Sequence, residues 1–264
     1  MKPLILISND DGINATGLRV LHDSVAHLGD ILVVAPEHQC SAASHAVSIC
    51  KEMLYRVVTK DGQLWGHALE GMPSDCVKLG VLTLADRKPD LVLSGINPGA
   101  NIGNNILYSG TVAAAREGAM LGIPSIAVSL NYFRHTEKER HFETAGEWAA
   151  CLAEMVLQRG LPRGVVLNLN VPNVVSSEIR GVVISRQSRS MFLDEMEPTH
   201  ENGEVRAYRN VGKVMMEEPE PDENNDDVVL KHNKVSITPL HYDLTEHHFR
   251  EELDAWLREH GRES

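Results

Sequence analysis

Cysteine is scarce in this chain of 264 residues and forms no recognisable pattern. There are four cysteines, none in a C-x-x-C pair: Cys40, Cys50, Cys76 and Cys151. Their spacing excludes a dense disulfide framework and argues against a zinc site built from thiolates. We therefore expect four reduced thiols in a cytoplasmic protein.

Long hydrophobic runs are missing as well. The N-terminus reads M-K-P-L-I-L-I-S-N-D-D, in which the apolar run is four residues long and is soon followed by two aspartates. A signal peptide has a longer apolar core, and a membrane span needs about 20 apolar residues. We expect neither a visible export signal nor a membrane segment.

Basic residues are outnumbered, because 25 Lys and Arg stand against 37 Asp and Glu, for a net charge of −12. Proteins that bind a nucleic-acid polymer usually present a basic face, so the composition argues against such a partner. Solubility is the plain explanation of this charge. The charge also means that a phosphate-bearing ligand needs a cation nearby to offset the local negative field.

The apolar residues that are present predict alternating strands and helices. Apolar runs predict strands at 4–8, 31–35, 91–93, 124–129 and 165–170, and two more at 182–184 and 235–238. Helical spacing predicts helices around 18–28, 77–84, 112–119, 142–156 and 249–257. Gly29 and Gly122 are expected to end helices, and Ser74 and Thr245 to cap them.

This alternation predicts an α/β fold with a Rossmann-like, doubly wound and mostly parallel sheet. We expect one domain over 1–264, with a core at 1–175 and a β-rich C-terminal extension at 176–264. Within the extension, the segment Glu217 to Asp227 holds two prolines and seven acidic residues. Such a run is typical of a solvated loop.

The first polar cluster is S-N-D-D-G, which follows the first predicted strand. Asp10 and Asp11 would lie at the carboxyl edge of the sheet, where open α/β folds place their sites. Adjacent carboxylates repel, and a hard divalent cation relieves the repulsion. A polar turn closed by Gly12 is the structural alternative. An EF-hand is excluded because Val20 stands where its last glutamate would be, and a haloacid-dehalogenase pair would have one residue between its aspartates.

A second cluster, H-Q-C-S-A-A-S-H, follows the second strand at the same edge. Ser41 and Ser44 could offer a hydroxyl to a metal or a phosphate, although serine is also common in ordinary turns. His38 and His45 are interpreted as surface or packing residues, because no third histidine at suitable spacing completes a zinc site.

The third cluster is the most informative: S-G-I-N-P-G-A-N-I-G-N-N-I-L-Y-S-G-T-V-A-A-A-R-E-G, residues 94–118. Loops of this length in compact domains are more often functional than structural. Ser109, Gly110 and Thr111 open the helix that follows, and free N–H groups at a helix N-terminus bind anions. The loop has neither the G-K-[ST] of a P-loop nor the G-x-G-x-x-G of a dinucleotide site. Together the three loops predict an oxygen-only site that favours Mg²⁺ or Mn²⁺ over zinc.

These residues resemble the SurE family of nucleotidases along nearly the whole chain. The resemblance is densest in I-L-I-S-N-D-D-G-I-N-A-T-G-L, S-G-I-N-P-G-A-N-I-G, Y-S-G-T-V-A-A-A-R-E-G and V-S-I-T-P-L. It implies a divalent metal ion in each subunit, Mg²⁺ or Mn²⁺, with ligands at Asp10, Asp11, Ser41 and Asn97. It also implies a phosphate-binding group formed by Asn9, Asn101, Ser109, Gly110 and Thr111.

The resemblance further implies hydrolysis of nucleoside 5′- and 3′-monophosphates, with short polyphosphate as a substrate of some members. Homodimers or homotetramers that exchange the C-terminal extension are implied too. Two departures stand out: Ala42 replaces a glycine of the family pattern, and Asn233-Lys234 replaces Gly-Tyr. Both bear on substrate preference and assembly rather than on the metal ligands.

Several mechanisms and functions stay open at this stage. Asp10 or Asp11 would orient or deprotonate a metal-activated water, and a covalent phosphoryl group on Asp10 is the alternative route. The N–H groups near Gly110 and Thr111 would stabilise charge on the phosphoryl group. The rival functions are a nucleotide or metal sensor without turnover, an oxidoreductase and a purely structural dimer.

Overall fold

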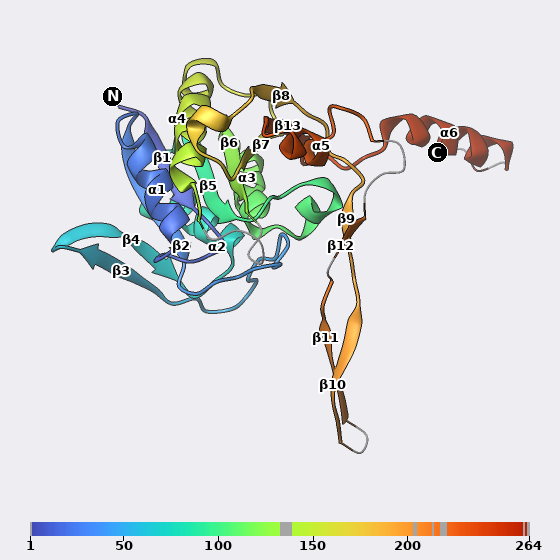
Figure 1. Ribbon diagram of the computed structural model, residues 1–264, viewed down its shortest axis with the longest axis horizontal. Coiled ribbons are helices and arrows are strands. Elements are labelled where there is room, and N and C mark those ends of the chain that lie inside the picture. Colours follow the sequence, from blue (N-terminus) through green and yellow to red (C-terminus); the bar gives the residue numbers. More distant parts are fainter. Residues whose placement is uncertain are drawn as a thin grey trace.

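A computed structural model gives the fold and describes residues 2–132, 139–202, 205–212, 214–216, 221–260 and 262. Its centre is a nine-stranded sheet in the order β3-β4-β2-β1-β5-β6-β7-β13-β8 (Figure 1). In that order the strands are Tyr55–Lys60, Gln63–Leu69, Asp30–Pro36, Leu4–Ser8, Leu91–Pro98, Ser125–Asn131, Val165–Pro172, Val235–His241 and Val182–Ile184. The six strands from β4 to β7 run parallel, which confirms the Rossmann-like prediction.

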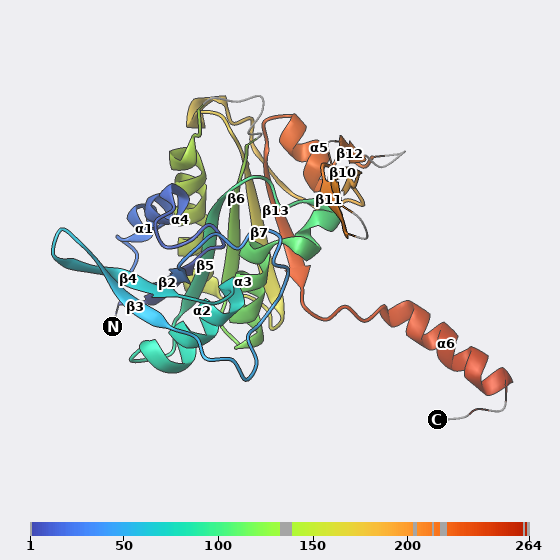
Figure 2. The ribbon, with the colours of Figure 1, turned by 90° about the horizontal axis from the view of Figure 1, so that it is seen from below.

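Helices cover both faces of the sheet. The α-helices are α1 (Thr16–Val25), α2 (Pro73–Leu79), α3 (Gly110–Met120), α4 (Phe142–Arg159), α5 (Asp226–Lys231) and α6 (His247–Glu259). Shorter turns of helix are η1 (Gly80–Leu84), η2 (Gly103–Tyr108) and η3 (Ser176–Glu178). Helices α1 and α4 pack on one face of the sheet, and α2 and α3 on the other (Figure 2).

Strand β1 is buried on both faces, as the apolar run at 4–8 predicts, and its neighbour β5 is largely buried as well. All five residues of β1 are buried, and so are the first six of β5. Parallel strands fixed in this way bring their carboxyl ends to one edge of the sheet. The polar loops after β1, β2 and β5 therefore start side by side, because these three strands are neighbours.

Several predicted helix ends were wrong. Helix α1 ends at Val25, before the predicted stop at Gly29. Ser74 lies inside the first turn of α2, where Asp75 accepts the Met72 N–H instead. Thr245 does not cap α6, because the Glu246 carboxylate accepts the N–H of Phe249. At the starts of α2 and α6, a carboxylate one residue from the expected hydroxyl accepts a backbone N–H.

The C-terminal extension is partly integrated into the sheet. Strand β13 pairs with β7 antiparallel and with β8 parallel. The central sheet therefore contains strands from both sides of the predicted boundary at residue 175. Between β8 and β13 the chain forms an arm of two ladders, β9 (Met191–Leu193) with β12 (Val214–Met216) and β10 (Met196–Asn202) with β11 (Val205–Asn210). The arm and α6 both project from the body (Figure 1).

The acidic segment is only partly the solvated loop that was predicted. Residues 217–220 lie outside the described residues. Asn225, Asp226 and Asp227 are buried, because α5 starts there and packs against the sheet. Asn233 follows this helix with a φ of +53°. Asparagine tolerates this left-handed conformation better than most residues, which accounts for its replacing a glycine.

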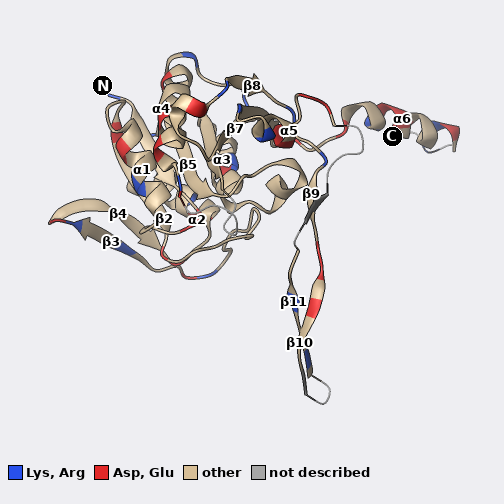
Figure 3. Ribbon diagram, viewed as in Figure 1, with Lys and Arg blue, Asp and Glu red and all other residues tan. Residues whose placement is uncertain are grey.

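Basic residues and cysteines are spread over many elements of the described chain. In the part of the chain that the structure describes, Lys and Arg are scattered and do not gather on one element (Figure 3). All four cysteines are free. Among the described residues, no helix combines the length and the apolar character needed to cross a membrane.

Candidate metal and phosphate site

The first loop turns sharply after β1 and buries its first carboxylate. The Asn9 side chain bonds to Gly12 twice, through Nδ2 to the carbonyl at 3.1 Å and through Oδ1 to the N–H at 3.1 Å. Asn9 is itself buried, so it shapes the turn. This Asx-type turn brings Asp10, only 6% exposed, and the more exposed Asp11 to the sheet edge.

Asp10 lies against the N-terminus of α3. The Thr111 hydroxyl donates to Asp10 Oδ1 at 2.5 Å. A side chain at Gly110 would come within 2.8 Å of the Asp10 Cβ and 3.0 Å of its Oδ2, so glycine allows this approach. Burial raises the pKa of the Asp10 carboxyl, and the hydrogen bonds from Thr111 oppose that rise. A buried carboxylate of this kind is stabilised further by a cation.

The second loop carries Ser41 on the far side of the same edge. Gln39 Nε2 donates to Asp11 Oδ1 at 3.2 Å and to Ser41 Oγ at 2.8 Å, which places these two predicted ligands on one amide group. Cys40 donates its N–H to the Asp10 carbonyl at 2.7 Å. Burial and the nearby Asp10 and Asp75 carboxylates raise the pKa of the Cys40 thiol, so this thiol is a poor nucleophile.

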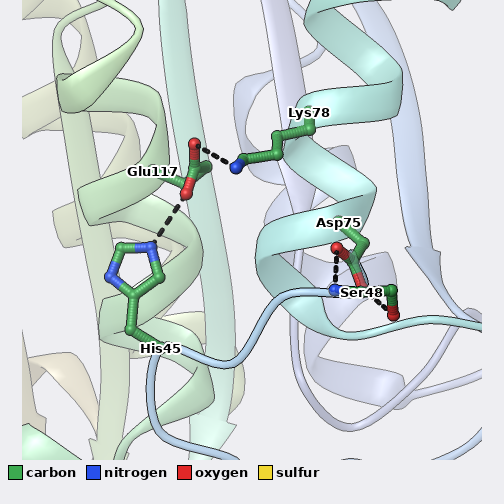
Figure 4. A network of polar contacts seen from close by, with 5 residues as sticks. All are labelled: His45, Ser48, Asp75, Lys78 and Glu117. Carbon is green, nitrogen blue, oxygen red and sulfur yellow. Dashed lines mark hydrogen bonds and ion pairs between the residues drawn. The ribbon is translucent and has the colours of Figure 1, made fainter. Parts of the chain in front are cut away.

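Side chains further along this loop fasten it to two helices (Figure 4). His45 Nε2 lies 2.9 Å from Glu117 Oε2 of α3, and Lys78 of α2 lies 3.5 Å from the other carboxylate oxygen. Asp75 of α2 accepts both the N–H and the hydroxyl of Ser48 at 2.9 Å. His45 is therefore a packing residue, as interpreted from the sequence, and the network holds the loop that carries Ser41.

The polar groups of Ser44 are used in contacts within the fold. Its hydroxyl donates to the Leu107 carbonyl at 2.8 Å, and its N–H donates to the Tyr108 carbonyl at 3.0 Å. Of the two serines considered from the sequence, Ser41 remains available to a ligand. Ser44 instead joins the second loop to η2 of the third.

The third loop adds carboxamides and a capped helix start. Asn97 Nδ2 donates to the Gly99 carbonyl at 2.7 Å, which leaves its Oδ1 for a cation. Asn101 is held by Ser129 at 2.8 Å and by Asn170, whose Oδ1 accepts the Asn101 N–H at 2.9 Å. Ser109 Oγ accepts the Val112 N–H at 3.1 Å as the cap of α3, and its own O–H is left to donate outward.

One cavity of about 480 Å³ collects these groups. Its lining includes the four predicted metal ligands and two of the predicted phosphate ligands: Asp10, Asp11, Ser41, Asn97, Asn101 and Ser109. The structure thus brings six of the predicted residues together around one cavity. Asn9, Gly110 and Thr111 lie next to these residues in the chain but do not line the cavity.

All three loops lie in a stretch of the chain that a protein-family model matches. The family model described as Survival protein SurE matches residues 5–194. The chain belongs to the SurE family.

Relatives resemble this SurE chain over nearly its full length. The 5′-nucleotidase SurE of Chlorobaculum tepidum is 40% identical over 255 residues, which are 97% of this chain and 95% of that protein. The 5′-nucleotidase SurE of Moorella thermoacetica is 42% identical, with 96% of each chain covered. The crystal structure of the SurE protein from Aquifex aeolicus has a TM-score of 0.81 at 33% identity and covers 96% of this chain and 99% of that one.

Sequence reasoning missed part of the site of this SurE chain. Gln39 gave no signal, because a glutamine between a histidine and a cysteine is unremarkable in a polar loop. The outer wall of the cavity was missed as well, since it comes from the arm, more than 80 positions after the loops it meets. Its lining residues are Met191, Phe192, Asp194 and Asn210.

Proposed function

We propose that this protein is a metal-dependent phosphatase that hydrolyses nucleoside 5′-monophosphates. The observation that carries the proposal is one cavity in which two carboxylates, a hydroxyl and an amide oxygen meet beside the capped start of α3. Relatives about 40% identical over nearly their whole length are described as 5′-nucleotidases. Fold alone would not support this activity; the support comes from the donors gathered in the cavity together with relatives similar over nearly the whole chain.

The donor set fits one Mg²⁺ or Mn²⁺ ion in each subunit. Asp10, Asp11, Ser41 and Asn97 offer only oxygen, which these hard cations prefer. Among the described residues, no group of three or more His, Cys, Asp or Glu forms a softer site. When bound, the ion would offset phosphate charge and make a water molecule more acidic.

The protein groups divide the work of hydrolysis in this proposal. Asp11 accepts the proton of the attacking water, because it lies on the cavity and is the more exposed carboxylate. Asp10 is held by Thr111 and contributes charge to the cation site. The Ser109 hydroxyl lies on the cavity at the start of α3 and donates to the phosphoryl oxygens, and the positive end of the α3 dipole stabilises their charge.

Phosphate release from a substrate panel tests the function. The panel contains nucleoside 5′- and 3′-monophosphates and tripolyphosphate, each with Mn²⁺, with Mg²⁺ and with EDTA. We expect metal-dependent release, highest on 5′-monophosphates and lost in Asp11→Asn, with Asp61→Asn in the β3–β4 turn as the control. Binding of nucleotide without release under any condition would favour a sensor.

Transfer of label from substrate to protein separates the two chemical routes. We expect no phosphorylated enzyme after acid quenching, because Asp10 is engaged by Thr111 and attack by water is the proposed step. Label that is trapped in the wild-type protein and absent from Asp10→Asn would assign a covalent route to Asp10.

We also propose that the chain assembles into a homodimer or homotetramer through its extension. Helix α6 carries an apolar face, Phe249, Leu253, Trp256 and Leu257, each between 43% and 46% exposed. Light scattering should give a mass above the 29.1 kDa monomer. Leu253→Glu should lower that mass, and Glu251→Lys on the opposite face should not; a monomeric wild-type protein would contradict the proposal. The cytoplasmic location stays a prediction.

A further inference from the structure

The cavity of the proposed metal site has an outer end that phosphate chemistry does not use. We call the part lined by Asp10 and Asp11 its inner end and the part lined by the base of the arm, Met191, Phe192, Asp194 and Asn210, its outer end. A phosphoryl group needs only the inner end. The whole cavity, at about 480 Å³, matches in scale the pockets that enclose a small ligand rather than a phosphoryl group alone.

Two aromatic side chains line this cavity. Tyr108 is the last residue of η2 and is 56% exposed, and Phe192 lies in β9 and is 46% exposed. The chain has only four phenylalanines and five tyrosines, and neither of these two is used in the core. Exposed aromatic surface beside a polar site is typical of ligand stacking.

Hydrogen bonds hold Phe192 beside the third loop. The Asn104 N–H donates to the Ser190 carbonyl at 2.8 Å, and the Phe192 N–H donates to Asn105 Oδ1 at 3.4 Å. At Gly103 any side chain would come within 2.3 Å of the Ser190 carbonyl oxygen. The base of the arm and η2 therefore form one unit, and Phe192 keeps its place relative to Ser109.

The polar groups of the outer part are also fixed. Asn210 Nδ2 donates to Asp194 Oδ1 at 2.7 Å, and Asn210 Oδ1 accepts the Gly212 N–H at 3.0 Å. These bonds tie the end of β11 to the strand-to-strand connection after β9. The wall around Phe192 is thus ordered by its own contacts and is available to a planar ring.

We infer that Phe192 and Tyr108 form a stacking site for the nucleobase, so that the base of the arm determines the preference of this enzyme for nucleotides over other phosphomonoesters. The inference rests on the proposed phosphatase function and adds the recognition of the base to it. Every base has a π-face, so stacking tolerates all four bases. The arm then has a role in substrate binding within its own subunit.

Comparing nucleoside 5′-monophosphates with ribose 5-phosphate tests this site, because the second substrate keeps the sugar and phosphate and lacks the base. In Phe192→Ala we expect KM for the nucleotides to rise roughly 10-fold, since a base–aromatic stack contributes about 1–3 kcal/mol. The kcat should stay within about twofold, and kcat/KM for ribose 5-phosphate should not change. Tyr108→Ala should act in the same direction.

Three controls keep the test specific. Phe192→Trp retains a planar ring and should keep the nucleotide preference, whereas Phe192→Leu is apolar but not planar and should lose it. Tyr55→Ala removes an aromatic residue of β3 with similar exposure, 51%, and should behave like wild type. Equal losses on both substrates in Phe192→Ala would overturn the inference. A wild-type enzyme that hydrolyses ribose 5-phosphate as well as nucleotides would also overturn the inference, whereas one that releases no phosphate from nucleotides would overturn the proposed function itself.

Discussion

The two sides of the cavity are held in place by different means. On the sheet side, Asp10, Asp11 and Asn97 stand at the ends of β1 and β5, within or directly after a buried parallel ladder. On the outer side, Ser41 and Phe192 lie in a loop and in the arm, which hydrogen bonds to other segments of the chain hold in place. The strands of the sheet position Asp10, Asp11 and Asn97, whereas hydrogen bonds between segments position Ser41 and Phe192.

This difference separates chemistry from recognition. Catalytic groups must keep their geometry closely, and regular elements give more exact positions than loops. Groups that recognise the remainder of a substrate tolerate more movement. We expect substitutions on the sheet side to change turnover and those on the outer side to change affinity.

The largest effect is predicted for Asp10→Asn. This change removes one negative charge from the proposed cation site and keeps the size of the side chain. We expect kcat/KM for nucleoside monophosphates to fall at least about 100-fold, in the range of losses seen when a group that acts on the transition state is removed. Steady-state kinetics at saturating Mn²⁺ measures it.

Asp86→Asn is the matched control, because Asp86 is exposed and lies outside the cavity. Circular dichroism would verify that both variants fold. Near-normal rates in Asp10→Asn would mean that the sheet side does not carry the chemistry, and the contrast between the two sides would fail.

Asp226→Ala should have the next largest effect, on stability. The buried Asp226 carboxylate accepts the N–H groups of Gly103 at 2.9 Å and Ser188 at 3.1 Å, so it fastens the third loop to the segment that leads into the arm. Its removal leaves these buried donors without an acceptor. We expect a loss of about 3 kcal/mol in the free energy of unfolding, measured by urea denaturation.

The pH dependence of that loss gives a second check. Burial raises the pKa of the Asp226 carboxyl above its ordinary value of 3.8. The folded protein therefore keeps this proton to higher pH than the unfolded chain, and the contribution of Asp226 declines as pH rises from 3.8 through the folded pKa. The deficit of Asp226→Ala should be larger near pH 4 than near pH 8. Asp254→Ala on α6 should cost under about 1 kcal/mol at either pH.

The parts of the fold that the sheet positions could be predicted from the sequence, and the parts that long-range contacts position could not. The strand at 4–8 is an apolar run followed by a polar turn, and the strand at 165–170 is rich in apolar residues and ends before Pro172, so their type and parallel direction could be inferred locally. The three polar loops follow strands, so their convergence could be inferred too. The local sequence pattern was sufficient to predict those residues whose positions the sheet determines.

The outer side depends on contacts between segments far apart in the chain. Phe192 meets a loop about 85 positions earlier, and no spacing rule connects them. Asp226 looked like part of a charged, solvated run, yet buried N–H groups required an acceptor at that point. The hairpin of β3 and β4 was missed as well, because the exposed outer residues of β3 weaken its apolar pattern.

Gln39→Ala tests the tether on the metal side. Gln39 links Asp11 to Ser41, and residues that orient metal ligands typically contribute 10- to 100-fold to metal affinity. We expect Mn²⁺ to bind about 10-fold more weakly in calorimetric titration, with little change in kcat at saturating metal. Gln63→Ala in β4 is the control. Unchanged affinity would show that the loop holds Ser41 without Gln39.

The smallest effect is predicted for Ala42→Gly, next to Ser41. Ala42 has a φ of +57°, a left-handed conformation that costs an L-residue about 1–2 kcal/mol. Glycine removes this cost but loses about 0.4–1 kcal/mol through the greater freedom of the unfolded chain. The net result should be a stabilisation of under about 1 kcal/mol, with kcat unchanged because the Ser41 hydroxyl stays where it is. Ala43→Gly is the matched control, since Ala43 has no positive φ, and it should destabilise the protein. Equal destabilisation by both changes would mean that Ala42 carries no strain, and that its place in the family pattern has another cause.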